Sequence, residues 1–504
     1  MVMVPLYKTI TPRFLSMTTT RRIGFSRYRT AHQHWQPLIA ACLGTFLLLV
    51  YTSVVTAALP VIGTALGASY TALQWIVDSF TVALAGLLLA CGAVSDALGR
   101  KRCYLVGLAV FTVATAACGL AVSVGMLIAA RAVQGVAGAA MFATILPLVG
   151  LSYTGGDRAR AFAVWGTVAG VASAVGIFAG GVIAQLLGWR WIFLCSLPIC
   201  VVALVLGWVS LRTDQRRDTA LDYPGMLSFS VAATALTYAV ITGGDSGWGA
   251  PSALAGFLIA ALAIAVFVRV ERVGAAPILS PELFANRQLS GVLLVAFGYY
   301  FGTFGALPVL SLWLQSAGGL GPLAASCVLG TQMVVFILAS STLSARWQAV
   351  APSRALGGST VLIAVGCVCA ATVFVVPSWA ALLPALIITG FGAGIVSPIF
   401  PAVAMSSVPE RLGGTAGAAA NTARQLGLAW GVALCATMFG GHATTGVTDI
   451  AAPFLACAVV ALISGIVGGL LLRHHRVARA ATDAVAPHRD SRTSACNTAA
   501  VHPD

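Results

Sequence analysis

Residues 92–102 read GAVSDALGRKR and separate two long apolar runs, 71–94 and 103–122. Gly92 permits close helix contact, and the closing basic trio favours the polar face of a membrane. Asp96 can accept hydrogen bonds or face the positive end of a neighbouring helix. A short charged turn between two runs of about 20 apolar residues predicts a pair of membrane-spanning helices.

The whole chain has the same character. Of its 504 residues, 59% are hydrophobic and 8% are charged, whereas soluble domains carry roughly a quarter charged residues. This composition excludes a soluble multidomain enzyme. A net charge of +14 would suggest nucleic acid in a soluble protein, but here the basic residues lie in short loops and tails. No nucleic-acid partner is therefore expected.

Apolar runs between charged or turn-rich breaks predict an all-α membrane protein with fourteen transmembrane helices. They fall at about 38–58, 71–94, 103–122, 126–150, 161–184, 192–211, 224–242, 253–270, 289–314, 321–342, 355–376, 379–404, 413–440 and 451–472. An even number places both termini on one side. Alternate loops and both tails are basic, and the opposite loops contain only Arg190 as a basic residue. The positive-inside rule then predicts that both termini are cytoplasmic.

The spans divide as six, two and six. Residues 38–211 and 289–473 are expected to form two six-helix bundles, and 212–288 to hold an inserted helix pair with charged loops. The translocation path is expected between the bundles. Residues 1–37 lack the apolar core of a cleavable signal and are expected to be a cytoplasmic tail, as is 474–504, which is expected to be disordered.

The loop at 92–102 resembles the loop signature of the major facilitator superfamily. In that family the residues matching Gly92, Asp96, Gly99 and Arg100 form a cytoplasmic latch between the bundles. The family's arginine after the acid is Ala97 here. The resemblance implies the major facilitator fold, with two bundles plus two inserted central helices.

Other helices, over essentially the whole of 38–473, resemble the fourteen-span drug:proton antiporters of this superfamily. Helix 4 carries the family's second motif, whose arginine, Arg131 here, is implied to act in proton coupling. Helix 5 resembles the motif that marks exporters, although Ile177 replaces its usual proline. Its glycines are implied to form the bundle interface: Gly166, Gly170, Gly176, Gly180 and Gly181.

Helix 1 also resembles these antiporters, but Tyr51 and Thr56 replace the family's aspartate and asparagine. The span at 413–440 matches them at NTARQLG, residues 421–427. The candidates for the substrate cavity are Tyr51, Thr56, Gln74, Gln134, Asn421, Arg424 and Gln425. Without the helix 1 aspartate, neutral or anionic amphipaths are expected to be better substrates than lipophilic cations.

Asp78 is the only acid well inside a predicted span, and Arg131 lies at a similar depth. Two interpretations are open: a structural ion pair, or a proton-carrying carboxylate whose pKa is tuned by the arginine. Arg424 lies near the middle of the span at 413–440, and no span of the C-terminal half contains an acid. Its partner is then a backbone carbonyl, the N-terminal half or a ligand.

The resemblance implies a monomeric, proton-coupled, alternating-access exporter of small amphipathic drugs, antibiotics or metabolites in a bacterial plasma membrane. Its partners are the substrate, protons and the lipid bilayer. Tyr51 and Ile177 keep open a proton-coupled transporter of an ordinary metabolite, and a non-transporting sensor or scaffold is a third alternative. No catalytic site, cofactor or metal site is expected, because all seven histidines lie outside the spans. No GxxxxGK[ST] phosphate loop occurs, so transport would draw on an ion gradient or be passive.

Overall fold

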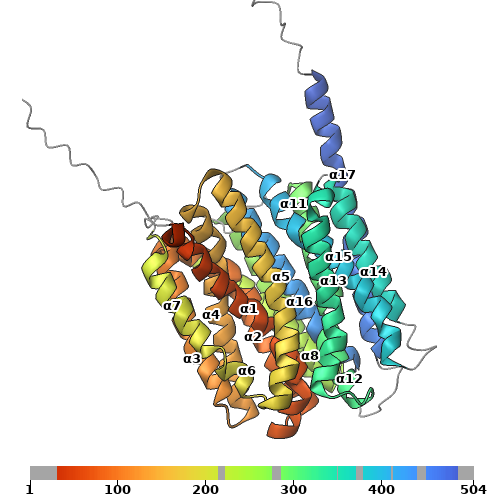
Figure 1. Ribbon diagram of the computed structural model, residues 1–504. Coiled ribbons are helices and arrows are strands. Elements are labelled where there is room, and N and C mark those ends of the chain that lie inside the picture. The colour runs from red at the N-terminus through yellow and green to blue at the C-terminus, as the bar shows by residue number, and fades with distance from the viewer. Residues whose placement is uncertain are drawn as a thin grey trace, which may run out of the picture. The chain divides into compact units, whose positions relative to one another are not determined.

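Long apolar helices make up the structure, a computed structural model (Figure 1). The residues that it describes are 31–213, 222–274, 285–348, 350–370, 378–409, 412–439 and 450–485, and these contain helices and turns but no β-strand. The chain divides into two compact units, residues 1–35 and 36–504. The second unit contains the predicted spans and is described below. Most of the predicted tails, residues 1–30 and 486–504, lies outside the described residues.

The helices of the N-terminal half are α1 (Ala31–Leu66), α2 (Tyr70–Leu98), α3 (Arg100–Gly119), α4 (Val124–Ser152), α5 (Gly155–Leu186), α6 (Trp191–Leu194) and α7 (Leu197–Ser210). An inserted pair follows, α8 (Tyr223–Ser246) and α9 (Pro251–Val273). The C-terminal half contains α11 (Arg287–Phe304), α12 (Leu307–Ser316), α13 (Pro322–Gln348), η1 (Ser353–Gly358), α14 (Ser359–Cys369), η3 (Trp379–Leu382), α15 (Leu383–Ser406), α16 (Gly413–Phe439) and α17 (Ala451–Val485).

Among the described residues, 12 helical segments are long and apolar enough to cross a membrane. Two predicted spans fall outside this group. The span at 355–376 begins as a shorter apolar helix, Ser353–Cys369, and the span at 413–440 is α16, a helix of 27 residues diluted by polar side chains such as Arg424. With these two, the prediction of fourteen helices is confirmed.

Two predicted spans are broken inside. The span at 192–211 consists of α6 and α7, and the span at 289–314 consists of α11 and α12. In each case the second helix begins with a proline, Pro198 or Pro308, in its first turn. Proline lacks the backbone donor that would continue the preceding helix, so the chain turns before it.

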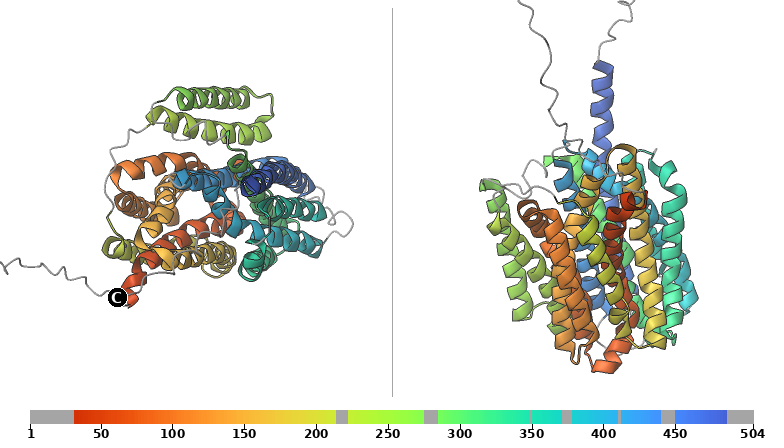
Figure 2. Two further views of the ribbon diagram at one scale, coloured as in Figure 1. Left: turned by 90° about the horizontal axis from the view of Figure 1, so that it is seen from above. Right: turned by 60° about the vertical axis from the view of Figure 1, so that its left-hand side comes forward.

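The helices pack into two groups with a pair beside them. In the N-terminal half α4 packs against α2 and α3, and in the C-terminal half α11 packs against α16 and α17. The halves meet where α5 contacts α13 and where α2 contacts α16. The inserted pair lies to one side of the other helices (Figure 2, left view): α8 contacts α2 and α16, and α9 packs on α8.

The turn between α2 and α3 marks one end of this unit. Gly99 closes it with φ of 100°, a conformation that glycine adopts more readily than other residues. Lys101 Nζ donates to the carbonyl oxygens of Trp208 (2.7 Å) and Leu211 (2.8 Å), which ties the end of α7 to the same turn. We call this the basic end, after residues 100–102, and the other the far end.

Candidate functional site

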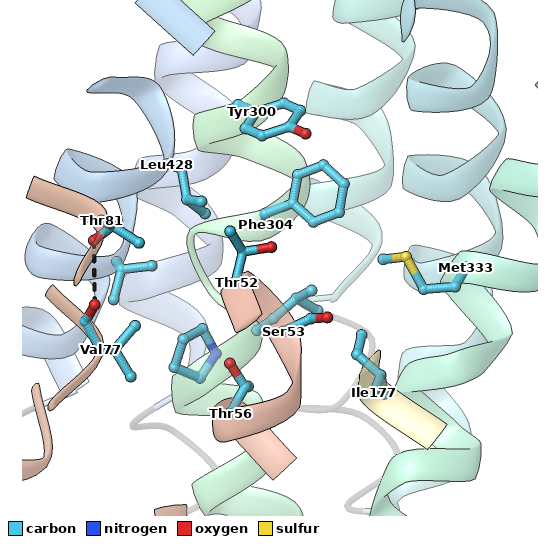
Figure 3. Close-up of a pocket in the computed structure, with 13 residues that line it drawn as sticks. Thr52, Ser53, Thr56, Val77, Thr81, Ile177, Tyr300, Phe304, Met333 and Leu428 are labelled. Atoms are coloured by element: carbon cyan, nitrogen blue, oxygen red, sulfur yellow. Dashed lines mark hydrogen bonds between the residues drawn. The ribbon is translucent and has the colours of Figure 1, made fainter. Parts of the chain in front are cut away.

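A cavity of about 510 Å³, counting space open to solvent, lies between the two halves (Figure 3). It is lined from the N-terminal half by Thr52, Ser53, Thr56, Val77, Thr81 and Ile177, and from the C-terminal half by Tyr300, Phe304, Leu307, Pro308, Met333, Leu428 and Val432. The lining residues include no charged side chain. The cavity therefore suits a molecule with both apolar and uncharged polar parts.

The two walls of the cavity differ in chemistry. Four hydroxyl side chains, Thr52, Ser53, Thr56 and Thr81, come from α1 and α2, whereas the facing wall is aromatic and aliphatic. Thr52 Oγ1 donates to Leu49 O (2.7 Å) and Ser53 Oγ to Val50 O (3.2 Å), on their own helix. Because each proton is used there, these hydroxyls offer mainly acceptor lone pairs to a ligand.

Of the seven residues predicted to line a substrate cavity, only Thr56 lines this one. Gln134 is buried within the N-terminal half, where its Nε2 donates to Thr115 Oγ1 (2.7 Å). Gln74, Asn421 and Gln425 are also buried, in α2 and α16. Arg424 lies beside the cavity and is described below.

Tyr51 points away from the cavity into the N-terminal half. It is 1% exposed, and its hydroxyl is hydrogen-bonded to Ser196 Oγ. Its ring stacks on Phe193 and meets Phe111 edge-on, with centroids 5.7 and 5.6 Å apart. The prediction that Tyr51 faces a substrate is therefore wrong for this structure, because the next residue, Thr52, takes the cavity-facing side of α1.

Asp78 is fully buried, with 0% exposure. Its Oδ1 lies 3.5 Å from Thr81 Oγ1, and its Oδ2 has no hydrogen-bond partner. Gln74, one turn earlier on α2, also has an unpartnered side-chain oxygen. Thr81 itself lines the cavity, so the carboxyl group lies directly behind the cavity wall.

Arg131 is also fully buried, but it is not paired with Asp78. Its guanidinium donates to Ile76 O (3.1 Å), Gln134 Oε1 (2.6 Å) and Tyr51 O (3.3 Å), and it lies 4.2 Å from the centroid of the Phe80 ring. These contacts join α4 to α1 and α2. The interpretation of Arg131 and Asp78 as a structural ion pair is wrong for this structure, since all the arginine's nitrogens face other acceptors.

The predicted interface glycines of α5 contact two different neighbours. A methyl group at Gly176 would lie 2.8 Å from Val50 O, and one at Gly180 would lie 2.5 Å from Val54 O, both on α1. A methyl group at Gly181 would lie 2.8 Å from Pro322 O, and one at Gly170 would lie 3.2 Å from the Phe336 ring, both on α13. A methyl group at Gly166 would meet nothing within 4 Å. These glycines thus lie on two faces of α5. One face packs on α1 in the same half, and the other packs on α13 in the opposite half.

Contacts between the halves gather toward the far end. There Gln185 Oε1 accepts from Leu323 N (3.1 Å), and Gln315 Nε2 donates to Ala57 O (3.2 Å). On the α2 side, Tyr70 Oη donates to Ala436 O (2.8 Å). Toward the basic end, methyl groups at Gly92 and Gly166 would meet nothing within 4 Å. The described contacts therefore close the far end.

The predicted latch residues lie at the basic end. Asp96 accepts from Arg100 Nε (2.9 Å) and Nη2 (2.8 Å), one turn along the chain. Gly99 makes the turn between Asp96, at the end of α2, and Arg100, the first residue of α3. Residues 410 and 411, just before the start of α16, lie outside the described residues. The latch between the halves stays a prediction.

Arg424 lies among aromatic rings beside the cavity. It is 5% exposed, and its guanidinium carbon lies 4.7 Å from the Tyr300 ring, 5.4 Å from Phe142 and 5.7 Å from Phe400. Tyr300 also lines the cavity. Phe142 belongs to α4 and so to the other half, which puts this guanidinium at the junction of the two.

The sequence reasoning missed the aromatic wall. Tyr300 and Phe304 are spaced i, i+4 on α11, so they share one helix face. That pair in the first helix of the C-terminal half was the available signal. No sequence pattern distinguishes Met333 and Leu428 as cavity residues, because apolar residues occupy every face of a membrane helix.

Helices of this length and apolarity, arranged in two halves around a central cavity, define an integral membrane transporter. The chain belongs to the Major Facilitator Superfamily, whose family model matches residues 41–432. The predicted resemblance is thus confirmed.

Relatives within the superfamily are named for antibiotics. The chain is 34% identical to the methylenomycin A resistance protein of Bacillus subtilis (strain 168), over 81% of this chain and 88% of that protein. It is 33% identical to the puromycin resistance protein pur8 of Streptomyces alboniger, over 83% of this chain and 84% of that protein. The fold is also similar to that of the POT family transporter PepTSo, with a TM-score of 0.64 and 14% identity over 88% of this chain and 98% of that one.

Proposed function

We propose that the protein exports small amphipathic molecules, among them antibiotics and other drugs, across a bacterial plasma membrane in exchange for protons. The names of the relatives support drug export. An uncharged cavity with one hydroxyl wall and one aromatic wall supports amphipathic cargo. The observation that carries the proton coupling is Asp78, a buried carboxyl group with one unpartnered oxygen, placed behind the cavity residue Thr81.

The basic end is cytoplasmic in this proposal, because the arginine-rich loops follow the positive-inside rule. The far-end contacts then close the path to the outside, and the structure represents the inward-facing state of a monomeric transporter. Alternation requires the α5–α13 and α2–α16 contacts to part at the far end and to form at the basic end. Asp96 and Arg100 act there as the latch, with Gly92 and Gly99 allowing the approach.

Asp78 couples this motion to protons. A buried carboxylate without a cationic partner carries a large desolvation cost, and proton uptake removes the charge. Protonation therefore favours the conformation in which α2 is packed away from water, and release favours a hydrated one. Substrate binding and proton binding alternate, because Thr81 lines the cavity and also contacts Asp78.

Proteoliposomes containing the full chain test the function. With an imposed pH gradient, puromycin should be moved against its own concentration gradient while protons move the opposite way, and an uncoupler should abolish both. Puromycin equilibration that is indifferent to the pH gradient and to the uncoupler would reject the proton-coupled exchange. A panel of further antibiotics extends the measurement beyond the relatives' substrates.

A further inference from the structure

Two hydrogen-bond donors of the Arg424 guanidinium are left without a well-formed hydrogen bond. Its Nε and Nη2 are buried and have no hydrogen-bond partner. Three aromatic rings surround the group, and among the described residues it forms no ion pair. Rings offset part of the cost of burying a cation, but an unmade hydrogen bond at a buried donor remains costly.

Arg131 is a control within the same chain. It is equally buried, yet its Nε, Nη1 and Nη2 each have a protein acceptor. Each nitrogen of this buried guanidinium thus has a protein acceptor. The hydroxyls of Tyr299 and Tyr300 interact with the Arg424 guanidinium, yet its Nε and Nη2 make no hydrogen bond of normal geometry. Both donors can therefore still take an acceptor from a ligand.

The open donors lie next to the cavity. Leu428, one turn further along α16 and on the same helix face, lines the cavity, as does Tyr300, whose ring Arg424 contacts. Figure 3 shows Tyr300 and Leu428 at the same border of the cavity. A ligand resting between the hydroxyl and aromatic walls therefore has the guanidinium of Arg424 close by, next to the lining residue Tyr300.

We propose that Arg424 binds the negatively charged group of the transported molecule, so that the substrates include anionic amphipaths, above all aromatic carboxylates. Nε and Nη2 form one edge of a guanidinium, the geometry that holds a carboxylate through two parallel hydrogen bonds. The aromatic or aliphatic body of the substrate then lies against Tyr300 and Phe304. This inference rests on the proposed export function and names its substrate class.

A lipid headgroup shares the chemistry of such an anion, but the depth of the site disfavours it. Arg424 lies eleven residues after Gly413, the first residue of α16, which is roughly 16 Å along the helix axis. That is about half the thickness of a bilayer core. The anion is therefore assigned to the cargo, and the experiment below includes lipid as an alternative source.

The contact with Phe142 links the bound anion to the transport cycle. Phe142 lies on α4, and Tyr300 and Phe400 lie on α11 and α15. When the halves move, the guanidinium loses or gains the ring from the opposite half. Binding of an anion at Arg424 is thus expected to differ between the two conformations, as cargo release requires.

Equilibrium binding to the purified full chain in phosphatidylcholine nanodiscs tests the proposal without any proton gradient. The probes share one skeleton: 2-naphthoate, its methyl ester and 2-naphthylmethylamine. The wild type should bind 2-naphthoate at least about tenfold more tightly than the ester, the equivalent of about 1.4 kcal/mol, and the amine most weakly. Arg424→Gln should bring the carboxylate down to the level of the ester and leave ester binding unchanged.

Arg424→Lys should keep part of the preference, because a lysine offers charge without the two-pronged edge. It also preserves the test if the Gln variant fails to fold, since the ratio between carboxylate and ester is read within each variant. Arg190→Gln is the matched control: Arg190 also stacks on an aromatic ring, Trp189, at 4.4 Å, but lies outside the cavity lining, and its loss should not change the ratio.

Three results would overturn the proposal: no binding of 2-naphthoate by the wild type, equal binding of acid and ester, or an unchanged preference in both Arg424 variants. If phosphatidylglycerol nanodiscs abolish the preference, the anion at Arg424 is a lipid and the cargo assignment fails. Failure of the export function is distinguishable, because it would appear as gradient-independent transport in proteoliposomes while this binding pattern remained.

Discussion

Thr81 joins the substrate cavity to the buried carboxyl group of Asp78: its Oγ1 lies 3.5 Å from Asp78 Oδ1, and the same side chain lines the cavity. A change in the occupancy or hydration of the cavity therefore reaches Asp78 through a single side chain. No intervening network is needed for substrate and proton to influence each other.

Asp78→Asn should abolish uphill, proton-driven transport and leave substrate exchange across equal concentrations intact. The amide matches the carboxyl group in size but cannot carry the proton. Counterflow and gradient-driven uptake in proteoliposomes measure the two activities. Asp157→Asn is the matched control, because Asp157 lies in the first turn of α5 with its side chain 45% exposed. Gradient-driven uptake by the Asp78 variant at the wild-type level would contradict the assignment.

Tyr51→Phe should lower stability by about 1 kcal/mol, the usual net value of one buried hydrogen bond. Tyr51→Asp should lower it much more, because it leaves a carboxylate among Phe111, Phe193 and backbone carbonyls. Thermal unfolding in detergent checks both. We expect no gain in the efflux of lipophilic cations from the Asp variant. A stable Tyr51→Asp protein with strong cation efflux would show that this position reaches the cavity after all.

Gly181→Ala should weaken far-end closure, because the methyl group would lie 2.8 Å from Pro322 O on α13. Overpacking of this kind costs about 1–3 kcal/mol, which lowers the ratio of the closed to the open far end roughly fivefold or more. Faster hydrogen exchange in the first turns of α13 would report the opening. Gly166→Ala is the control on the same helix, since its methyl group meets nothing within 4 Å. Equal exchange in both variants would speak against the interface role.

Arg131→Lys should destabilise the N-terminal half while leaving the ratio of protons to substrate unchanged. A lysine cannot reach Ile76 O, Gln134 Oε1 and Tyr51 O together, and each hydrogen bond lost from a charged group costs about 1.5–3 kcal/mol. Unfolding temperature and coupled proton flux, measured on the inserted fraction, separate the two effects. A changed proton ratio at normal stability would return Arg131 to proton coupling.

The sequence was sufficient to predict the number of helices. Each membrane span requires a long apolar run, which can be recognised without knowledge of the tertiary structure. The sequence was insufficient for helix rotation. Tyr51 and Thr52 are neighbours, yet one is buried beside Phe193 and the other lines the cavity, and the choice depends on packing against α3 and α6. Likewise Asp78 and Arg131 share a depth, but the guanidinium is turned toward carbonyl oxygens. Two residues at the same depth in the membrane can be expected to lie near each other. Whether their side chains touch depends on which faces of their helices are turned toward each other.

The hydroxyl wall has an evolutionary consequence. Thr52 donates its proton to a carbonyl group of its own helix, which already bonds within that helix, so removal of this hydroxyl leaves no distant partner unsatisfied. The lining can then accumulate single replacements at little cost to folding. A lineage exposed to a new toxin can therefore change the residues of this wall one at a time and keep a folded protein at every step.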